Sequence, residues 1–177
     1  MRHFLANIMT YTLAALLLLG AGVFAWVRSA QVVITDEYTV LQRYDYPDDR
    51  AAGIAELGAR SYVRNCLSCH AADGRGWDQY PPIIDSGKIA RQPGGRDYLI
   101  DLHLYGLTSD RWGAPMPPMG HMHDIELAAV LTHITRHWDA IQSGAPVPAF
   151  EPDEIAARRD QRKTPWQVND TRPAGAE

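Results

Sequence analysis

The strongest hydrophobic pattern in the chain is a continuous apolar stretch near the N-terminus. From Phe4 to Val27 there are 24 residues without an acidic or a basic side chain. A helix needs about 20 predominantly apolar residues to cross the hydrocarbon core of a bilayer. The pattern therefore predicts a single-pass transmembrane helix, with residues 1–28 as an N-terminal anchor. The alternative is a signal peptide that is cleaved after the small residue Ala25.

Apolar positions at helical spacing predict an all-α domain in the rest of the chain. Ile54, Leu57, Tyr62 and Val63 recur in this way within residues 51–70. The other helices are expected over Arg96–Gly106, Asp124–Trp138 and, as one short charged helix, Asp153–Lys163. Val32–Thr35 is the one short β-branched run, and it predicts either a short strand or an extended segment packed on a neighbour.

These elements suggest four parts of the chain. After the anchor, residues 29–50 are expected to connect it to a compact domain over residues 51–142. Residues 143–177 form a proline-rich docking tail, which begins with an extended linker. The tail either folds back on the domain, with Phe150 and Trp166 as anchors, or docks on another subunit.

The amino-acid composition excludes several functional classes for this protein. The formal net charge is −4 and the pI is about 5.9, so the chain has no basic surplus to support nucleic-acid binding. Two cysteines in 177 residues exclude a disulfide-built scaffold. Acidic and histidine side chains are scattered without the pattern of an acid–base or nucleophilic catalytic site. The remaining candidate chemistry lies around the two cysteines.

Both cysteines lie in one short motif, Cys66-Leu67-Ser68-Cys69-His70. Cys-x-x-Cys-His is the attachment signature of a c-type haem, in which the adjacent imidazole ligates the iron. A structural zinc site normally needs four ligands, and a thioredoxin-like site needs a βαβ context. A plain disulfide is the other alternative. The adjacent histidine favours one covalently bound haem c, held by Cys66, Cys69 and His70 in a small haem-wrapping domain.

A second ligand to the iron is expected from the proline-stiffened residues 113–123. The candidates there are Met116, Met119, Met122, His121 and His123. Methionine opposite histidine stabilises ferrous iron and raises the reduction potential. Met116 is preferred because two prolines follow it and fix the backbone after the sulfur-bearing residue. The two histidines are expected to be solvated loop residues.

Five sequence motifs follow one another between residues 58 and 138. They are Gly58-x-x-x-Tyr62-x-x-x-Cys66-x-x-Cys69-His70, Asp73-Gly74-x-Gly76, Pro81-Pro82-Ile83, Met116-Pro117-Pro118 and the terminal helix Asp124–Trp138. With them the chain resembles the class I (mitochondrial-type) cytochrome c family, as a membrane-anchored monohaem member. The resemblance implies that Met116 is the sixth ligand and that the Pro81 carbonyl meets His70. It also implies that Gly58 and Tyr62 cross the terminal helix near Val130 and His133.

Two positions depart from the family pattern. At His123 the family commonly has a polar residue that starts the helix, a role that Asp124 could take instead. The family usually has an aromatic residue, often tyrosine, where His133 stands. We expect His133 to replace that residue in the packing; the alternative is that it makes the crossing sensitive to pH.

The predicted function is electron transfer rather than catalysis. Two strong protein ligands would leave no iron position for a small-molecule substrate. Because covalent haem attachment takes place outside the bacterial inner membrane, the haem domain is expected in the periplasm. The expected donors are quinol–cytochrome c oxidoreductase or a periplasmic dehydrogenase, and the expected acceptor is a terminal oxidase. The alternatives are a haem peroxidase or gas-binding sensor with a labile sixth ligand, and a subunit whose haem only stabilises the fold.

Overall fold

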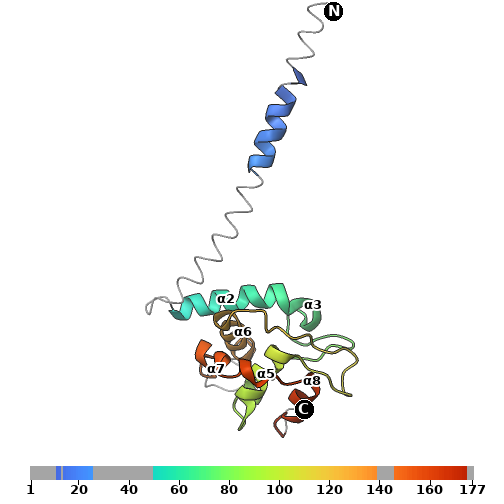
Figure 1. The fold of residues 1–177 in the computed structure, drawn as a ribbon, viewed down its shortest axis with the longest axis vertical. Helices are drawn as coiled ribbons and strands as arrows, with labels where there is room; N and C mark the ends of the chain where they lie inside the picture. The colour runs from blue at the N-terminus through green and yellow to red at the C-terminus, as the bar shows by residue number, and fades with distance from the viewer. Residues whose placement is uncertain (1–10, 13, 26–49, 139–145, 175–177) are drawn as a thin grey trace, which may run out of the picture. The chain divides into compact units, whose positions relative to one another are not determined.

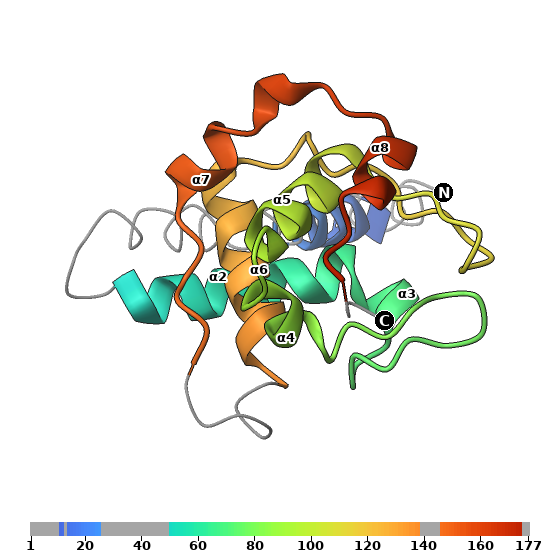
Figure 2. The ribbon, with the colours of Figure 1, turned by 90° about the horizontal axis from the view of Figure 1, so that it is seen from below.

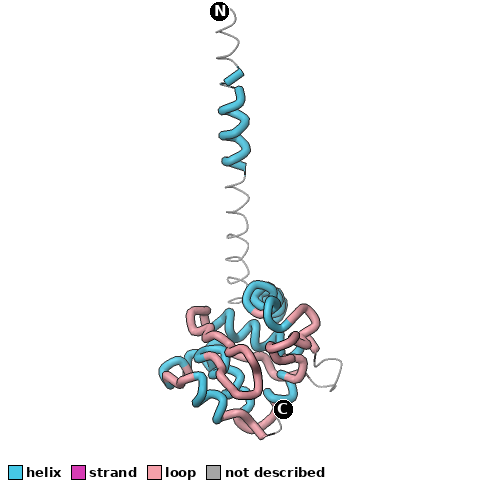
Figure 3. Tube along the Cα trace, turned by 90° about the vertical axis from the view of Figure 1, so that its right-hand side faces the viewer, coloured by secondary structure: helices cyan, strands magenta, loops and turns pink. Residues whose placement is uncertain are grey.

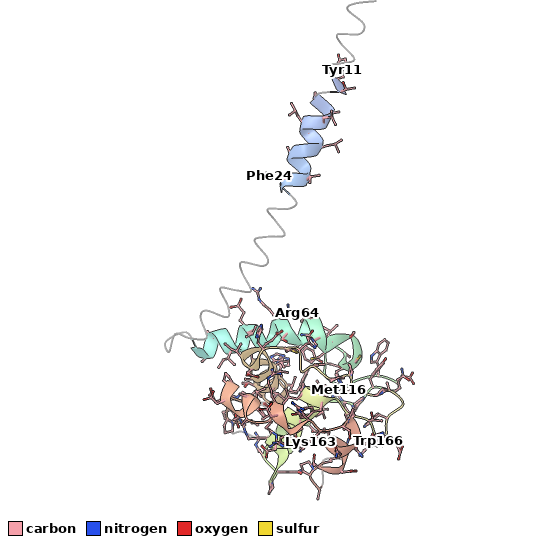
Figure 4. All side chains as sticks on the ribbon, viewed as in Figure 1. Tyr11, Phe24, Arg64, Met116, Lys163 and Trp166 are labelled. Carbon is pink, nitrogen blue, oxygen red and sulfur yellow. The ribbon has the colours of Figure 1, made fainter. Side chains whose placement is uncertain are left out.

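The computed structural model describes residues 11–12, 14–25, 50–138 and 146–174, and the chain divides into two compact units, residues 1–42 and 43–177. In the first unit, residues 14–25 are helical and exposed. Figure 4 labels two residues of this unit, Tyr11 and Phe24. Within the described part of the chain, no helix has both the length and the hydropathy that a membrane crossing requires. The predicted connector up to residue 49 and the run Val32–Thr35 lie outside the described residues.

The second unit is built from helices and the loops that join them (Figures 1 and 3). In chain order these are α2 (Arg50–Asn65), α3 (Leu67–His70), α4 (Ser86–Ala90), α5 (Gly95–Tyr105), α6 (Asp124–Arg136), α7 (Pro152–Ala156), the 3₁₀ helix η2 (Arg159–Gln161) and α8 (Pro165–Asp170). Extended pairing in the described residues is limited to two isolated bridges, Trp77 with Tyr80 and Leu107 with Met116. The mostly helical structure agrees with the predicted all-α class.

Helices α2 and α6 cross closely at a glycine, and the crossing is visible in Figure 2. A Cβ placed on Gly58 would lie 2.3 Å from the carbonyl oxygen of Ala129 and 2.9 Å from the Cβ of His133. Only glycine therefore allows this approach. The rings of Tyr62 and His133 lie 5.6 Å apart one turn further along α2. The expected crossing is present, with Ala129 rather than Val130 opposite Gly58.

The helix predicted over residues 51–70 is divided at Cys66. The backbone of Cys66 has φ −119°, and its carbonyl accepts from the amides of Cys69 and His70 at 3.1 and 2.9 Å. Apolar periodicity continues through this turn, so it did not reveal the break. The other two long helices lie close to their predicted ranges, with α5 starting one residue early and α6 ending two residues early.

The C-terminal helix predicted over Asp153–Lys163 is also divided, into α7 and η2, and α8 follows it. Arg162 has φ 49°, a left-handed conformation that ends the helical run. Tertiary contacts explain the division, because Ile155 is fully buried while Arg158 turns to pair with Asp101. Local charge pattern gave no sign of those contacts.

Residues 146–174, called here the C-terminal segment, fold back on the helices of the same unit. Figure 2 shows the segment passing along α6 and α5, with α7 beside α6 and α8 beside α5. Its apolar anchors Val147, Phe150, Ile155 and Val168 are 0–1 % exposed. Trp166 (Figure 4) remains 49 % exposed, so the prediction that it anchors the segment was wrong. Val168 takes that place in α8.

Candidate haem site

A cavity lies between the Cys-x-x-Cys-His motif and the methionine-bearing loop. One side, called here the histidine wall, is formed by residues 66–83, and the other, the methionine wall, by residues 99–119. The histidine wall contributes Cys66, Cys69, His70, Pro81 and Ile83, and the methionine wall contributes Leu99, Leu102, His103, Leu107, Met116 and Met119. Apolar side chains thus surround a small number of possible iron ligands, as is typical of a cofactor site.

The two cysteines border the cavity as free thiols. Cys66 is 4 % exposed, and Cys69 is partly exposed. Burial raises the pKa of the Cys66 thiol to about 12. The disulfide alternative is therefore not what the structure contains. Among the described residues, no group of three or more His, Cys, Asp and Glu side chains is arranged to hold a metal ion by itself.

His70 is fixed in one tautomer at the histidine wall. Its Nδ1 lies 2.9 Å from the carbonyl oxygen of Pro81. A carbonyl can only accept a hydrogen bond, so Nδ1 carries the proton and Nε2 keeps its lone pair. Burial lowers the pKa of His70, which also favours the neutral ring. A neutral imidazole oriented by a carbonyl is the form that ligates iron well.

Hydrogen bonds within a short stretch of sequence hold the histidine wall. The amide of Gly76 donates to the carbonyl of His70 at 3.1 Å, and the amide of Ile83 donates to the carbonyl of Gly74 at 2.8 Å. Gly76 has φ +67°, and a Cβ there would lie 2.3 Å from the carbonyl oxygen of Tyr80. Glycine is therefore required for the turn that brings Pro81 back to His70.

The backbone of Met116 is fixed by a pair of hydrogen bonds to the chain that leaves α5. The amide of Leu107 donates to the carbonyl of Met116 at 3.0 Å, and the reverse bond is 2.9 Å. Gly106 permits this pairing because it has φ +81° and a Cβ there would lie 2.6 Å from the Met116 carbonyl oxygen. The side chain of Met116, labelled in Figure 4, is partly buried and borders the cavity.

The structure separates the other candidates for the second ligand. Met119 is 8 % exposed and borders the cavity, and its amide donates to the carbonyl of His103 at 2.7 Å. Met122 is 5 % exposed in the core and does not line the cavity. His121 and His123 are exposed and do not line it either. Met116 and Met119 are therefore the two thioethers that the cavity offers.

Several polar residues that line the cavity were missed by sequence reasoning, among them His103 and Arg172. His103 is 4 % exposed, and its Nδ1 lies 2.8 Å from the carbonyl oxygen of Leu99. Burial lowers the pKa of His103 to about 4, so the ring stays neutral at pH 7. Its position four residues after Leu99, on the face of α5 that lines the cavity, was the available signal.

These residues fit a covalently attached haem. Two thiols next to a tautomer-fixed imidazole lie on one wall, a thioether lies on the other, and apolar side chains lie around them. This combination defines a helical, c-type haem domain.

Comparison with known proteins agrees with this class. The cytochrome c family model matches residues 55–138. Two proteins named cytochrome c-552, one from Thermus thermophilus and one from a particular strain of that species, are each 32 % identical to this chain over 119 residues. The alignments cover 63 % of this chain and 90 % and 80 % of the two relatives.

The chain belongs to the cytochrome c family, and it binds haem c covalently through Cys66 and Cys69. Proteins of this family are typically electron-transfer proteins, and this one is an electron carrier of that general kind. The C-terminal segment lies beyond the residues that the family model matches.

Proposed function

We propose that this cytochrome carries single electrons in a bacterial respiratory chain, in which His70 and Met116 would be the two protein ligands of the haem iron. When bound, the haem supplies one-electron chemistry between ferric and ferrous iron. The protein's residues hold it in place: Cys66 and Cys69 fix the porphyrin, and Pro81 orients the imidazole. The observation that carries the proposal is that His70 and Met116 line one apolar cavity from its two walls.

The fixed backbone of Met116 favours electron transfer over the alternative of a peroxidase or gas-binding sensor. A labile sixth ligand needs a loop that can leave the iron. Here two hydrogen bonds to Leu107 and the two following prolines restrict that movement. A ligand retained in both oxidation states keeps reorganisation small and excludes a small-molecule substrate from the iron.

We also propose that residues 1–28 anchor the protein in the inner membrane, with the haem domain in the periplasm. The support is the stretch Phe4–Val27, which has no acidic or basic side chain. Within it, residues 14–25 are helical, and the side chains Leu16 to Leu19, Val23 and Phe24 are 61–75 % exposed. Exposed leucines on a helix fit a lipid environment better than water.

Extraction and mass spectrometry test the anchor. The native protein should require detergent for release from membranes, and its N-terminus should lie within the first few residues. A form starting after Ala30 and exported by a cleavable signal should be soluble and carry haem. Release by salt or carbonate alone, or a native N-terminus near Trp26, would contradict the anchor and leave a secreted cytochrome.

The proposed partners are subunits of respiratory complexes. Quinol–cytochrome c oxidoreductase or a periplasmic dehydrogenase would donate the electron, and a terminal oxidase would accept it. An anchor holds the carrier near both, because a tether replaces free diffusion by a high local concentration. Isolation of the native protein in mild detergent, followed by identification of the subunits that accompany it, tests this. Co-isolation with respiratory oxidoreductase subunits is expected, and reproducible isolation without them, together with no electron exchange in membranes, would contradict it.

A further inference from the structure

A positively charged side chain from the C-terminal segment, which lies outside the residues matched by the family model, borders the haem cavity. Arg172 lines the cavity, and among the described residues it is the member of the C-terminal segment that does so. Its Nε is buried from solvent and has no hydrogen-bond partner among the described residues. Burying an N–H group without an acceptor raises the free energy of the folded state, so an acceptor is expected beside it in the holoprotein.

The position of Arg172 is well supported by the segment that carries it. Helix α8 begins with a capping box in which the Thr164 hydroxyl accepts from the amide of Gln167, and Val168 is fully buried. The amide of Arg172 donates to the carbonyl of Asn169 at 3.2 Å and so continues the last turn. The guanidinium lies 5.9 Å from the centre of the Tyr98 ring on α5. Contacts on both sides therefore direct Arg172 to the cavity.

The cofactor itself offers the missing acceptor. Haem c carries two propionate carboxylates, which remain free when its vinyl groups have bonded to cysteine. A guanidinium matches a carboxylate through parallel N–H···O bonds, and such charge-assisted bonds are strong where water is excluded. We propose that Arg172 binds a haem propionate, so that the C-terminal segment completes the cofactor site.

Another arginine at the cavity fits this role less well. Arg111 also lines the cavity, but it is exposed and its guanidinium lies 5.7 Å from the centre of the Trp112 ring. Water already solvates an exposed cation, so pairing it with a carboxylate lowers the free energy less than pairing a buried one. The inference depends on haem lying in this cavity, as the proposed function also assumes. Haem staining and axial-ligand spectra test that assumption separately.

A cation at the propionate should make the ferrous state easier to reach. A positive charge near the haem favours the state that holds one more electron, and low local polarity strengthens the effect. Removing the charge should therefore lower the midpoint potential. The matched control is Arg162, which is exposed and carries the same charge ten residues earlier in the same segment.

The test is a set of redox titrations on the full-length holoprotein in detergent. Arg172→Gln should lower the midpoint potential and Arg172→Lys should restore most of the difference, while Arg162→Gln should leave it unchanged. Redox-induced infrared difference spectra give a second readout, in which Arg172→Gln and not Arg162→Gln should alter the propionate carboxylate bands. Equal behaviour of Arg172→Gln and Arg162→Gln in both measurements, with helix content intact, would overturn the proposal. So would a response confined to Arg111→Gln, which would assign the carboxylate to the other arginine.

Discussion

The two walls of the haem cavity are held by contacts of different range. The histidine wall is fixed by hydrogen bonds among residues 70–83, including the 2.9 Å contact of His70 with Pro81. The methionine wall depends on residues distant in sequence. Besides the local pairing of Leu107 with Met116, Arg159 of the C-terminal segment donates to the carbonyls of Gly120 at 2.6 Å and Met122 at 2.5 Å, directly after this wall.

This difference suggests that the two iron ligands depend on different parts of the fold. A wall that is held mainly by local hydrogen bonds depends less on the rest of the fold to keep the imidazole in place. The methionine wall remains in place only when α5, the loop and the C-terminal segment are assembled together. Perturbing distant parts of the molecule should therefore affect the sulfur ligand before the imidazole.

The largest expected effect comes from removing the attachment at the histidine wall. Cys66→Ser combined with Cys69→Ser should abolish haem staining on a denaturing gel, because no covalent bond then remains. The domain should also lose most of its folding stability, since the bound haem stabilises the folded state and fills the cavity. Circular dichroism would measure that loss. Staining that survives in the double variant would contradict covalent attachment at these cysteines.

The next effect concerns the ligand at the methionine wall. Met116→Ala should remove the sulfur–iron charge-transfer band, lower the midpoint potential markedly and allow cyanide or carbon monoxide to bind. Met119→Ala is the matched control, because Met119 borders the same cavity. It should cost about 2–4 kcal/mol of stability as a buried truncation and leave the band in place. Loss of the band in Met119→Ala alone would reverse the ligand assignment.

The same contrast explains how much could be predicted from the sequence. Cys66, Cys69 and His70 belong to one contiguous motif, and the turn that returns Pro81 to His70 carries its own glycines, so local pattern was sufficient. At the other wall, the two prolines after Met116 favoured it as the ligand, but local pattern did not exclude Met119 and Met122. Removing Met122 from the candidates, and seeing the backbone of Met116 fixed, required the Leu107 bridge and the burial of the loop.

The C-terminal segment was predicted least well. Its fold depends on pairing with a buried carboxylate of α5: Asp101 is 1 % exposed and binds both Arg158 and Lys163 at 2.6 Å. Such contacts across 57 and 62 residues leave no local signal. Helix α8 was nevertheless detectable, because Thr164 followed three residues later by Gln167 is a capping box with a proline at the first turn.

A smaller effect should follow from releasing the C-terminal segment from the methionine wall. Arg159→Ala removes charge-assisted bonds to Asp124 and to two loop carbonyls. We expect a loss of about 2 kcal/mol in the free energy of unfolding. On heating, the sulfur–iron band should disappear before the haem-bound imidazole is lost.

Arg162→Ala is the control for this prediction, because Arg162 is exposed in the same segment. It should change neither the unfolding free energy nor the temperature at which the band disappears. A band in Arg159→Ala that persists to the same temperature as in the parent protein would show that the segment does not support this wall.

The smallest effect concerns pH at the α2–α6 crossing behind the histidine wall. Burial, and to a lesser extent His137, lowers the pKa of His133 to about 4. Below pH 6.5 the unfolded chain therefore binds a proton that the folded protein does not, so stability should decline as the pH falls from about 6.5 to about 4. His133→Tyr should remove ~1 kcal/mol of this decline, because His133 is only partly buried and solvent screens the effect.

Denaturant titrations at pH 7 and pH 4.5 measure the difference, with His121→Gln as an exposed control. The parent and His121→Gln should lose stability in parallel, and His133→Tyr should lose less. A variant that follows the same curve as the parent would show that His133 is not the group that senses acid at this crossing.

The central claim is that the haem passes electrons during respiration. The most direct measurement follows the visible spectrum of this cytochrome in native membranes that lack other c-type signals, first with a respiratory electron donor and then with oxygen. We predict that the haem becomes reduced with the donor and is reoxidised by oxygen as fast as the membranes turn over, and that Met116→Ala slows both steps. A haem that keeps one oxidation state while the membranes respire at their full rate would contradict the account.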